Sequence, residues 1–226
     1  MAHKEKLVTI AVGVLALTMC CQASEITQRS GTQPNIETFY STDETIWSYN
    51  LRTDTTVFCR VDFNIHTENK GISFVRYQDN VKSPRQMLVR KKGFTAVHRY
   101  ELTASFRHSY PKDQGPYDAM DVKYPDGTTA TETITSQSND SECAIVESKP
   151  LVGTRERRNL QVLLEFRVKE SSNSQEKRRQ CFEEVKHILE KVQVERRINS
   201  EPLQMPPTCS EKCQRESSCS KQIPSE

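Results

Sequence analysis

Short runs in which apolar and polar residues alternate recur along most of the chain, separated by turn-forming residues. In the second run, Val57, Cys59, Val61 and Phe63 fall on one face, as in a half-buried strand. The pattern predicts about eight or nine strands, and the run at 94–106 forms either one long strand or two. The predicted strands cover residues 45–51, 56–63, 72–77, 87–90, 94–106, 117–124, 129–134, 143–147 and 160–168.

The strands follow one another at hairpin spacing, with no helical pattern between them. This order favours an up-and-down antiparallel barrel or a β-sandwich over any α/β fold. A chain of this length fits one β-domain, which we expect to occupy residues 24–198 together with one helix.

The periodicity changes after the last strand, and a helix is predicted over 174–194 with Asn173 or Ser174 as its N-cap. Because Cys181 lies on the apolar stripe of this helix, we expect it to be tied to the β-domain. The tail, 199–226, has no hydrophobic periodicity, and we expect little structure there except at its cysteines. The stripe consists of Cys181, Val185, Ile188, Leu189 and Val192.

The first twenty-three residues are typical of a secretory signal peptide. Lys4 and Lys6 provide the basic start, 7–19 the apolar core, and Cys21 and Ala23 the small residues before the cleavage site. The apolar run is shorter than the roughly 20 residues that a membrane-spanning helix needs. A lipoprotein signal at Cys20 is disfavoured by the large side chain before it. We therefore expect a secreted protein that does not associate with membranes.

Export changes how the eight cysteines are interpreted, because Cys20 and Cys21 leave with the signal peptide. An even number in an oxidising compartment predicts three disulfides, and spacing alone leaves their connectivity open. A zinc site in the tail cluster is disfavoured, since no histidine lies near it. Asn139 begins a glycosylation sequon in a polar stretch. The six remaining cysteines are Cys59, Cys143, Cys181, Cys209, Cys213 and Cys219.

Charge and motifs exclude several function classes. The formal charge of +2 moves towards zero once the basic signal peptide is removed, so a nucleic-acid partner is not expected. The sequence has no nucleophile elbow, no metalloprotease motif and no glycine-rich phosphate loop. Asp118 and Asp121 lie on opposite faces of a strand and cannot easily form a catalytic pair. We expect a binding protein with no catalytic residue, no cofactor and no metal.

An ordered set of segments resembles the tick salivary lipocalins, the family that includes histamine-binding proteins. The segment 35–50 resembles the family's opening short helix and first strand, and 56–62 its cysteine-bearing second strand. The strand starting at Cys143 resembles a late barrel strand of the family, and 164–168 falls where the family has a Glu-Leu-Trp/Tyr motif. The resemblance implies an eight-stranded antiparallel lipocalin-type barrel with a flanking C-terminal helix and a disulfide-linked tail.

The resemblance also implies disulfides and partners. Cys143 would join Cys181, and Cys59 would join Cys209 or Cys213. The disulfides that we expect are Cys59–Cys209, Cys143–Cys181 and Cys213–Cys219. The implied protein is a monomer in saliva that binds a small host mediator, either an amine such as histamine or serotonin or a lipid such as an eicosanoid. The alternative is a lipocalin that binds a host protein of complement or coagulation and holds no small ligand.

Candidate ligand contacts lie on three strands. The family's amine signature is altered here, since Ala144 follows Cys143 and Arg167 stands where an aromatic residue is expected after Glu165. The strand can also be oriented with its apolar face, which includes Leu164 and Phe166, pointing inward. Glu165 and Arg167 then form a solvated pair, and the apolar wall of the cavity suits an acyl chain. That apolar face is equally consistent with ordinary packed core. The candidates are Trp47, Tyr49, Asp118, Met120, Leu164, Glu165 and Phe166.

Two candidates have specific expected places. Trp47 shares a face with Tyr49, and the pair lines either the cavity entrance or, as favoured for Trp47, the closed end of the barrel. Asp118 shares a face with Met120, which makes it the expected internal carboxylate, although an edge position fits equally well.

Overall fold

The computed structural model describes residues 33–51, 59–79, 97–109, 115–151, 162–192, 207–217 and 219. Eight antiparallel strands form a closed barrel in the order β1 to β8, with β1 paired to β8. The predicted all-β barrel is therefore confirmed, and the sandwich is excluded. The strands are β1 Ile46–Asn50, β2 Arg60–Glu68, β3 Gly71–Asp79, β4 Val97–Arg107, β5 Ala119–Lys123, β6 Thr129–Gln137, β7 Cys143–Leu151 and β8 Leu163–Lys169.

Strand positions follow the alternation, with differences at the ends. The run at 94–106 forms one strand within the described residues, while the predicted strand at 87–90 and the signal peptide at 1–23 lie outside them. β2 continues past its predicted end to Glu68. A bulge after Phe63, where Asn64 has φ 53°, reverses the alternation of the two faces and turns Ile65 towards the interior.

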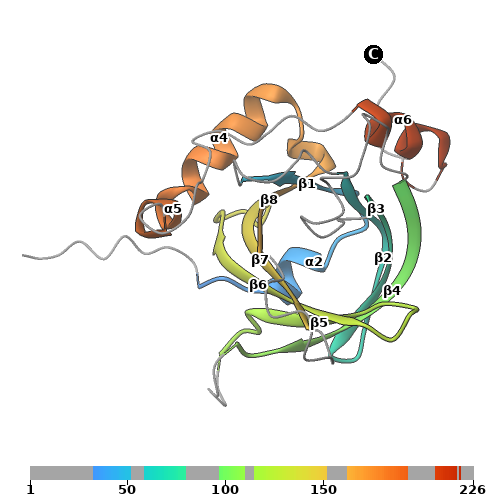
Figure 1. Cartoon of the computed structure of the whole chain (residues 1–226). Helices are drawn as coiled ribbons and strands as arrows, with labels where there is room; N and C mark the ends of the chain where they lie inside the picture. The colour runs from blue at the N-terminus through green and yellow to red at the C-terminus, as the bar shows by residue number, and fades with distance from the viewer. Residues whose placement is uncertain are drawn as a thin grey trace, which may run out of the picture. The chain divides into compact units, whose positions relative to one another are not determined.

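Helices lie inside and outside the barrel wall. The short helix α2 (Ile36–Tyr40) lies within the ring of strands, and the outer helices α4 (Gln175–Val185) and α5 (His187–Val192) lie against the barrel's outside (Figure 1). The predicted helix at 174–194 is thus split after Val185. The tail also differs from expectation, because it contains a helix, α6 (Pro207–Arg215), which includes one cysteine of each of two disulfides.

One end of the barrel is defined by α2, called here the α2 end. The amide of Ile36 donates to the carbonyl of Tyr117 at 2.8 Å, and the amide of Asn35 donates to Gln137 at 2.7 Å. These contacts place α2 beside the β4–β5 connection and the last residue of β6. The other end, called the far end, carries the turn from Tyr124 to Thr128 between β5 and β6.

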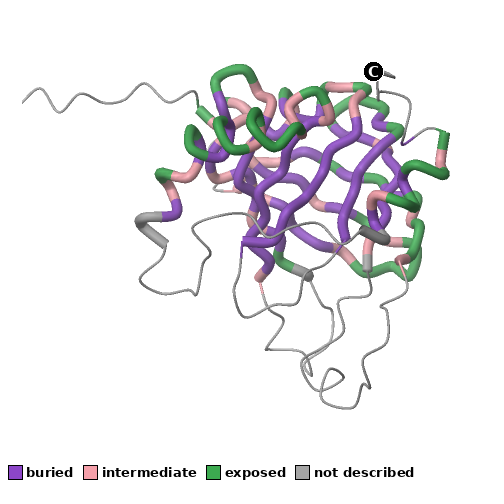
Figure 2. Tube along the Cα trace, turned by 90° about the horizontal axis from the view of Figure 1, so that it is seen from above, coloured by how far each residue is buried: buried purple, intermediate pink, exposed green. Residues whose placement is uncertain are grey.

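Two apolar layers occupy the two faces of the barrel wall. The inner layer joins α2 to inward side chains such as Phe74, Leu102 and Met120. The outer layer joins outward side chains such as Phe166 to Phe182 of α4, with ring centroids 5.2 Å apart. Figure 2 shows the barrel wall as largely buried, with exposed residues on the outer helices and on the turns that join the strands. β1, β8 and the first four residues of β2 are therefore buried on both faces.

Two disulfides attach the C-terminal helices to the barrel, and a third closes a short loop within the tail. Cys59 pairs with Cys209, Cys143 with Cys181, and Cys213 with Cys219, as expected. Because all three tail cysteines are bonded in this way, they cannot form a zinc site. No described helix is long and apolar enough to span a membrane.

The lengths of the closed loops predict the order of the disulfide contributions. Pairwise Cys→Ala replacement at Cys59–Cys209, which spans 150 residues, should lower the free energy of unfolding by about 4–5 kcal/mol. The 38-residue loop of Cys143–Cys181 should cost about 4 kcal/mol, and the 6-residue loop of Cys213–Cys219 about 2 kcal/mol. Urea unfolding of the three double variants measures this order, and a larger loss at Cys213–Cys219 would contradict it.

Candidate functional site

The barrel interior contains six charged side chains at one level, between the apolar α2 end and the far end. All come from strands, and each side chain is at most 3% exposed. Isolated charges are rarely buried this deeply, because losing their hydration costs several kcal/mol per ion. The six are Arg60 and Asp62 of β2, Arg76 of β3, Glu132 of β6, and Glu165 and Arg167 of β8; they are called the ion network below.

Strand alternation explains why these side chains converge. Residues two apart in a strand share a face, so Glu165 and Arg167 point the same way, and so do Arg60 and Asp62. Asp62 lies opposite Arg76 in the β2–β3 ladder, which brings their side chains side by side on the interior face. The alternating apolar residues of β2 and β8 then face the outer layer.

Arg76 joins the first two carboxylates. Its Nε and Nη2 donate to the two oxygens of Asp62 at 2.6 and 2.7 Å, and its Nη1 donates to Glu132 at 2.7 Å. The two-pronged contact with Asp62 matches the planar guanidinium to the carboxylate and is among the strongest hydrogen-bonded pairs in proteins. Arg76 therefore lies between two opposite charges.

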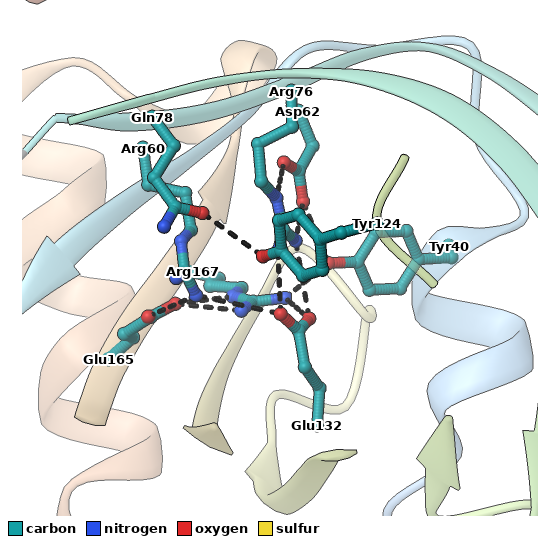
Figure 3. Close-up of polar contacts among 9 residues, drawn as sticks. All are labelled: Tyr40, Arg60, Asp62, Arg76, Gln78, Tyr124, Glu132, Glu165 and Arg167. Carbon is teal, nitrogen blue, oxygen red and sulfur yellow. Dashed lines mark hydrogen bonds and ion pairs between the residues drawn. The ribbon is translucent and has the colours of Figure 1, made fainter. Parts of the chain in front are cut away.

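Arg167 continues the chain of charges from Glu132. Its Nη1 donates to Glu132 at 2.6 Å, while its Nε and Nη2 donate to Glu165 at 2.9 and 2.7 Å. Arg60 follows, with Nη1 at 2.5 Å from Glu165 and 3.5 Å from Glu132. Positive and negative groups thus alternate from Asp62 to Arg60, as Figure 3 shows.

Tyr40 connects this network to α2. Its hydroxyl donates to Asp62 at 3.0 Å and accepts from Nη1 of Arg167. Burial raises the pKa of Tyr40 well above its ordinary value, which keeps the hydroxyl protonated. The helix at the α2 end is therefore held to the charges by a hydroxyl that is both donor and acceptor.

The arrangement keeps the contact between Glu132 and Arg167 ionic. Burial alone would raise the pKa of Glu132, but the guanidinium groups of Arg167, Arg76 and Arg60 outweigh it and hold that pKa well below its ordinary value. Burial alone would lower the pKa of Arg167, but Glu132, together with Tyr40 and Glu165, keeps it above the ordinary value. The three positive and three negative charges sum to zero.

Aromatic and amide side chains adjoin the network towards the far end. The Tyr124 hydroxyl lies 3.3 Å from Nη1 of Arg76 and donates to Gln78 at 3.2 Å. The Tyr124 ring packs edge-to-face on Tyr100 with centroids 5.6 Å apart, and both rings are only partly buried. Figure 3 shows Tyr124 and Gln78 beside the charged groups. This side of the network therefore combines ring faces with hydrogen-bonding groups.

Several residues predicted to contact a ligand lie on the outer face instead. Trp47, Tyr49, Leu164 and Phe166 belong to the outer layer, so neither place expected for Trp47 is correct. Trp47 donates its ring N–H to Glu170, and Tyr49 donates to Asn173 at 2.7 Å beneath the Arg178 guanidinium. These side chains attach the segment around α4 to the barrel.

The choice of the apolar face of β8 as interior was wrong, because that face packs on α4. Glu165 and Arg167 form no solvated pair; they are fully buried in the network. Met120 is interior as predicted, opposite Glu132 on the neighbouring strand. Asp118 is not an internal carboxylate, since it accepts hydrogen bonds from the backbone and hydroxyl of Ser109 in the β4–β5 connection.

Sequence reasoning missed Arg60, Asp62, Arg76 and Glu132 as site residues. For Arg60, Asp62 and Arg76 the available signal was a charge inside a predicted strand between apolar neighbours, which is unusual for a strand exposed on one side. Glu132 lies between two threonines and gave no such signal. The sequon residue Asn139 is exposed, as expected for an acceptor site, and its side chain donates to Glu184 of α4 at 2.9 Å. No group of three potential metal ligands occurs among the described residues.

Comparison with known proteins gives no assignment. The chain matches no protein-family model and no curated protein sequence.

Acid should unfold the protein partly through Glu132. Because its folded-state pKa is depressed, its contribution to stability is full above the unfolded value of about 4.3 and declines as the pH falls towards the folded value, at up to about 1.4 kcal/mol per pH unit. Glu132→Gln should cost about 3–5 kcal/mol at pH 7 and flatten this acid dependence. Urea midpoints between pH 3 and 7 measure both effects. The exposed Glu101→Gln is the matched control, and equal acid dependence in both variants would contradict the expectation.

Removing one hydroxyl should loosen α2 from the network. Tyr40→Phe removes one buried hydrogen bond from Asp62 and one from Arg167, so the free energy of unfolding should fall by about 1.5–3 kcal/mol. Tyr117→Phe is the control, because Tyr117 contacts α2 through its backbone carbonyl, and it should change stability by less than about 0.5 kcal/mol. Equal losses in the two variants would refute the assigned link.

Proposed function

We propose that this protein is a secreted lipocalin-like binding protein that sequesters a small mediator inside its barrel and catalyses no reaction. The closed eight-stranded barrel is compatible with that role, because barrels of this size can hold one small ligand. Three disulfides fit an oxidising, extracellular compartment.

The observation that carries the proposal is the ion network. A barrel that only needed stability would be better filled with apolar side chains, since replacing buried ion pairs by apolar groups of similar volume often stabilises a protein. Ligand sites, in contrast, combine an apolar wall with a few convergent polar groups. The apolar α2 end, the ion network and the partly buried rings of Tyr100 and Tyr124 provide this combination.

Two ligand classes fit the resemblance to tick salivary lipocalins, and each meets a different part of the site. A biogenic amine such as histamine or serotonin would stack on Tyr100 or Tyr124 and keep its ammonium group on the far-end side of the network. An eicosanoid or another lipid would place its chain along apolar side chains and keep its acidic group on that same side. In either case the groups of the network, such as Glu132 and Arg76, stay bonded to each other.

A second candidate function is binding of a host defence protein of complement or coagulation with no small ligand. The observation favouring it is that α6 is fixed to the barrel by Cys59–Cys209 and carries exposed Glu211, Gln214 and Arg215. The hydroxyl of Thr45 also bonds the carbonyl of Cys219 at 2.9 Å. A rigid, exposed helix of this kind suits recognition of another protein.

The test is to identify what the secreted protein carries and binds. Solvent extraction followed by mass spectrometry should find a small molecule, and calorimetric titration with histamine, serotonin and leukotriene should give a micromolar or tighter dissociation constant for one of them. Glu132→Gln, which removes one negative charge and leaves the network at +1, should weaken the binding of an amine by at least about tenfold, or strengthen the binding of an acidic lipid.

Glu101→Gln on the barrel exterior is the matched control and should leave binding unchanged. A protein with no extractable ligand and no response to the three mediators would refute sequestration and leave binding of a host protein as the function to pursue.

A further inference from the structure

We propose that the ligand group that reaches the ion network carries no net charge and hydrogen-bonds the hydroxyl of Ser48. This inference rests on the proposed function, because it specifies which part of a sequestered molecule enters the barrel to this depth. An amine or an acidic lipid would keep its ionised group towards the far end and present an uncharged ring, amide or hydroxyl to the network.

Ser48 is a buried serine on β1. Its side chain is fully buried, and its Oγ has no hydrogen-bond partner among the described residues. A buried hydroxyl without a partner loses the free energy of its hydrogen bonds to water, so such groups are rare and call for a specific explanation. A ligand atom that accepts or donates a hydrogen bond at this position would satisfy it.

The strand register places that hydroxyl beside the network. Ser48 lies opposite Arg167 in the β1–β8 ladder. On its other side Trp47 lies opposite Val61, so the next pair in register brings Ser48 next to Arg60. Opposite residues in a sheet share a face, which puts the Ser48 hydroxyl on the interior face between two guanidinium-bearing strands.

The ion network is already electrically neutral. The three guanidinium groups already match three carboxylates, and Glu132, Arg76 and Arg167 each make at least two charge-assisted contacts. A ligand charge added here would be buried without compensation or would displace an existing partner, and both are costly in a low-dielectric interior. An uncharged group with a hydrogen-bonding atom avoids this cost.

The neighbouring rings indicate the shape of that group. Tyr124 contacts Arg76 and Gln78 through its hydroxyl and packs on Tyr100, so a flat surface borders the network on the side towards the far end. A planar ligand can stack there and direct its polar atom to the network. An aromatic or conjugated carboxamide has this combination of a ring and an uncharged polar head.

Three small probes differ in charge at nearly constant shape: benzamide is neutral, benzamidinium carries +1 and benzoate carries −1. Titration of the full secreted protein, with its disulfides intact, can be followed by two-dimensional NMR. We expect benzamide to bind at least about tenfold more tightly than either ion. Tighter binding of either ion, equal binding of all three, or binding of none would overturn the inference.

Two serine variants test the hydroxyl. Ser48→Ala should weaken benzamide by about five- to tenfold, as expected for loss of one hydrogen bond. Ser136→Ala is the matched control, because Ser136 also has a buried Oγ without a partner among the described residues but lies opposite Ile145 of the outer layer. An unchanged benzamide affinity in Ser48→Ala, or an equal loss in both variants, would overturn the assigned contact.

Charge variants test the balance independently. Glu165→Gln gives the network a charge of +1 and should raise the affinity of benzoate relative to benzamide, while Arg60→Gln gives −1 and should favour benzamidinium. Where a charge variant does not fold, the order of the three probes in the unmodified protein decides. Failure of the proposed function is distinguishable, since it appears as absence of an extracted ligand and of any response to the three mediators, whatever the order of the probes.

Discussion

The alternation of opposite charges across the barrel interior is the constraint on which the other features depend. Six ionised groups are tolerable there only because each guanidinium lies against a carboxylate at hydrogen-bonding distance. The groups come from β2, β3, β6 and β8, so the network requires the closed barrel and a specific register of each of these strands. It also sets the position of α2, whose Tyr40 hydroxyl completes the contacts of Asp62 and Arg167.

The outer layer is the counterpart of this interior. With charges facing inward, the apolar residues of β1, β2 and β8 face outward, and they would be exposed if α4 and α6 did not cover them. Phe182 and the disulfides of Cys59 and Cys143 hold these helices in place. A one-residue slip of β8 would put Glu165 under α4 and Phe166 among the charges, so both layers select the same register.

Much of the fold could be predicted from local patterns: the period-two runs, the apolar stripe of the helix and the even number of cysteines each gave the correct class of element. The face of β8 that points to the interior could not be predicted. The alternation separates an apolar face from a charged one, but it does not say which of the two a helix covers. The usual assumption that apolar means interior placed Leu164 and Phe166 inside. Only the folded structure shows that Glu132 forms ion pairs with Arg60 and Arg76, which offset the free-energy cost of burying the three charges.

Barrel closure also bears on how the chain reaches its native state. The β1–β8 ladder joins Trp47 to Val168, residues far apart in the sequence, and such non-local pairings form slowly because loop-closure entropy is lost before the contacts can repay it. Before closure, the Asp62–Arg76 pair of the β2–β3 hairpin can form locally, whereas Glu132 has no neighbouring partner on its own hairpins among the described residues. A hairpin that contains β6 would therefore bury an uncompensated carboxylate unless it docks against the guanidinium groups, so burial of β6 is coupled to its native register.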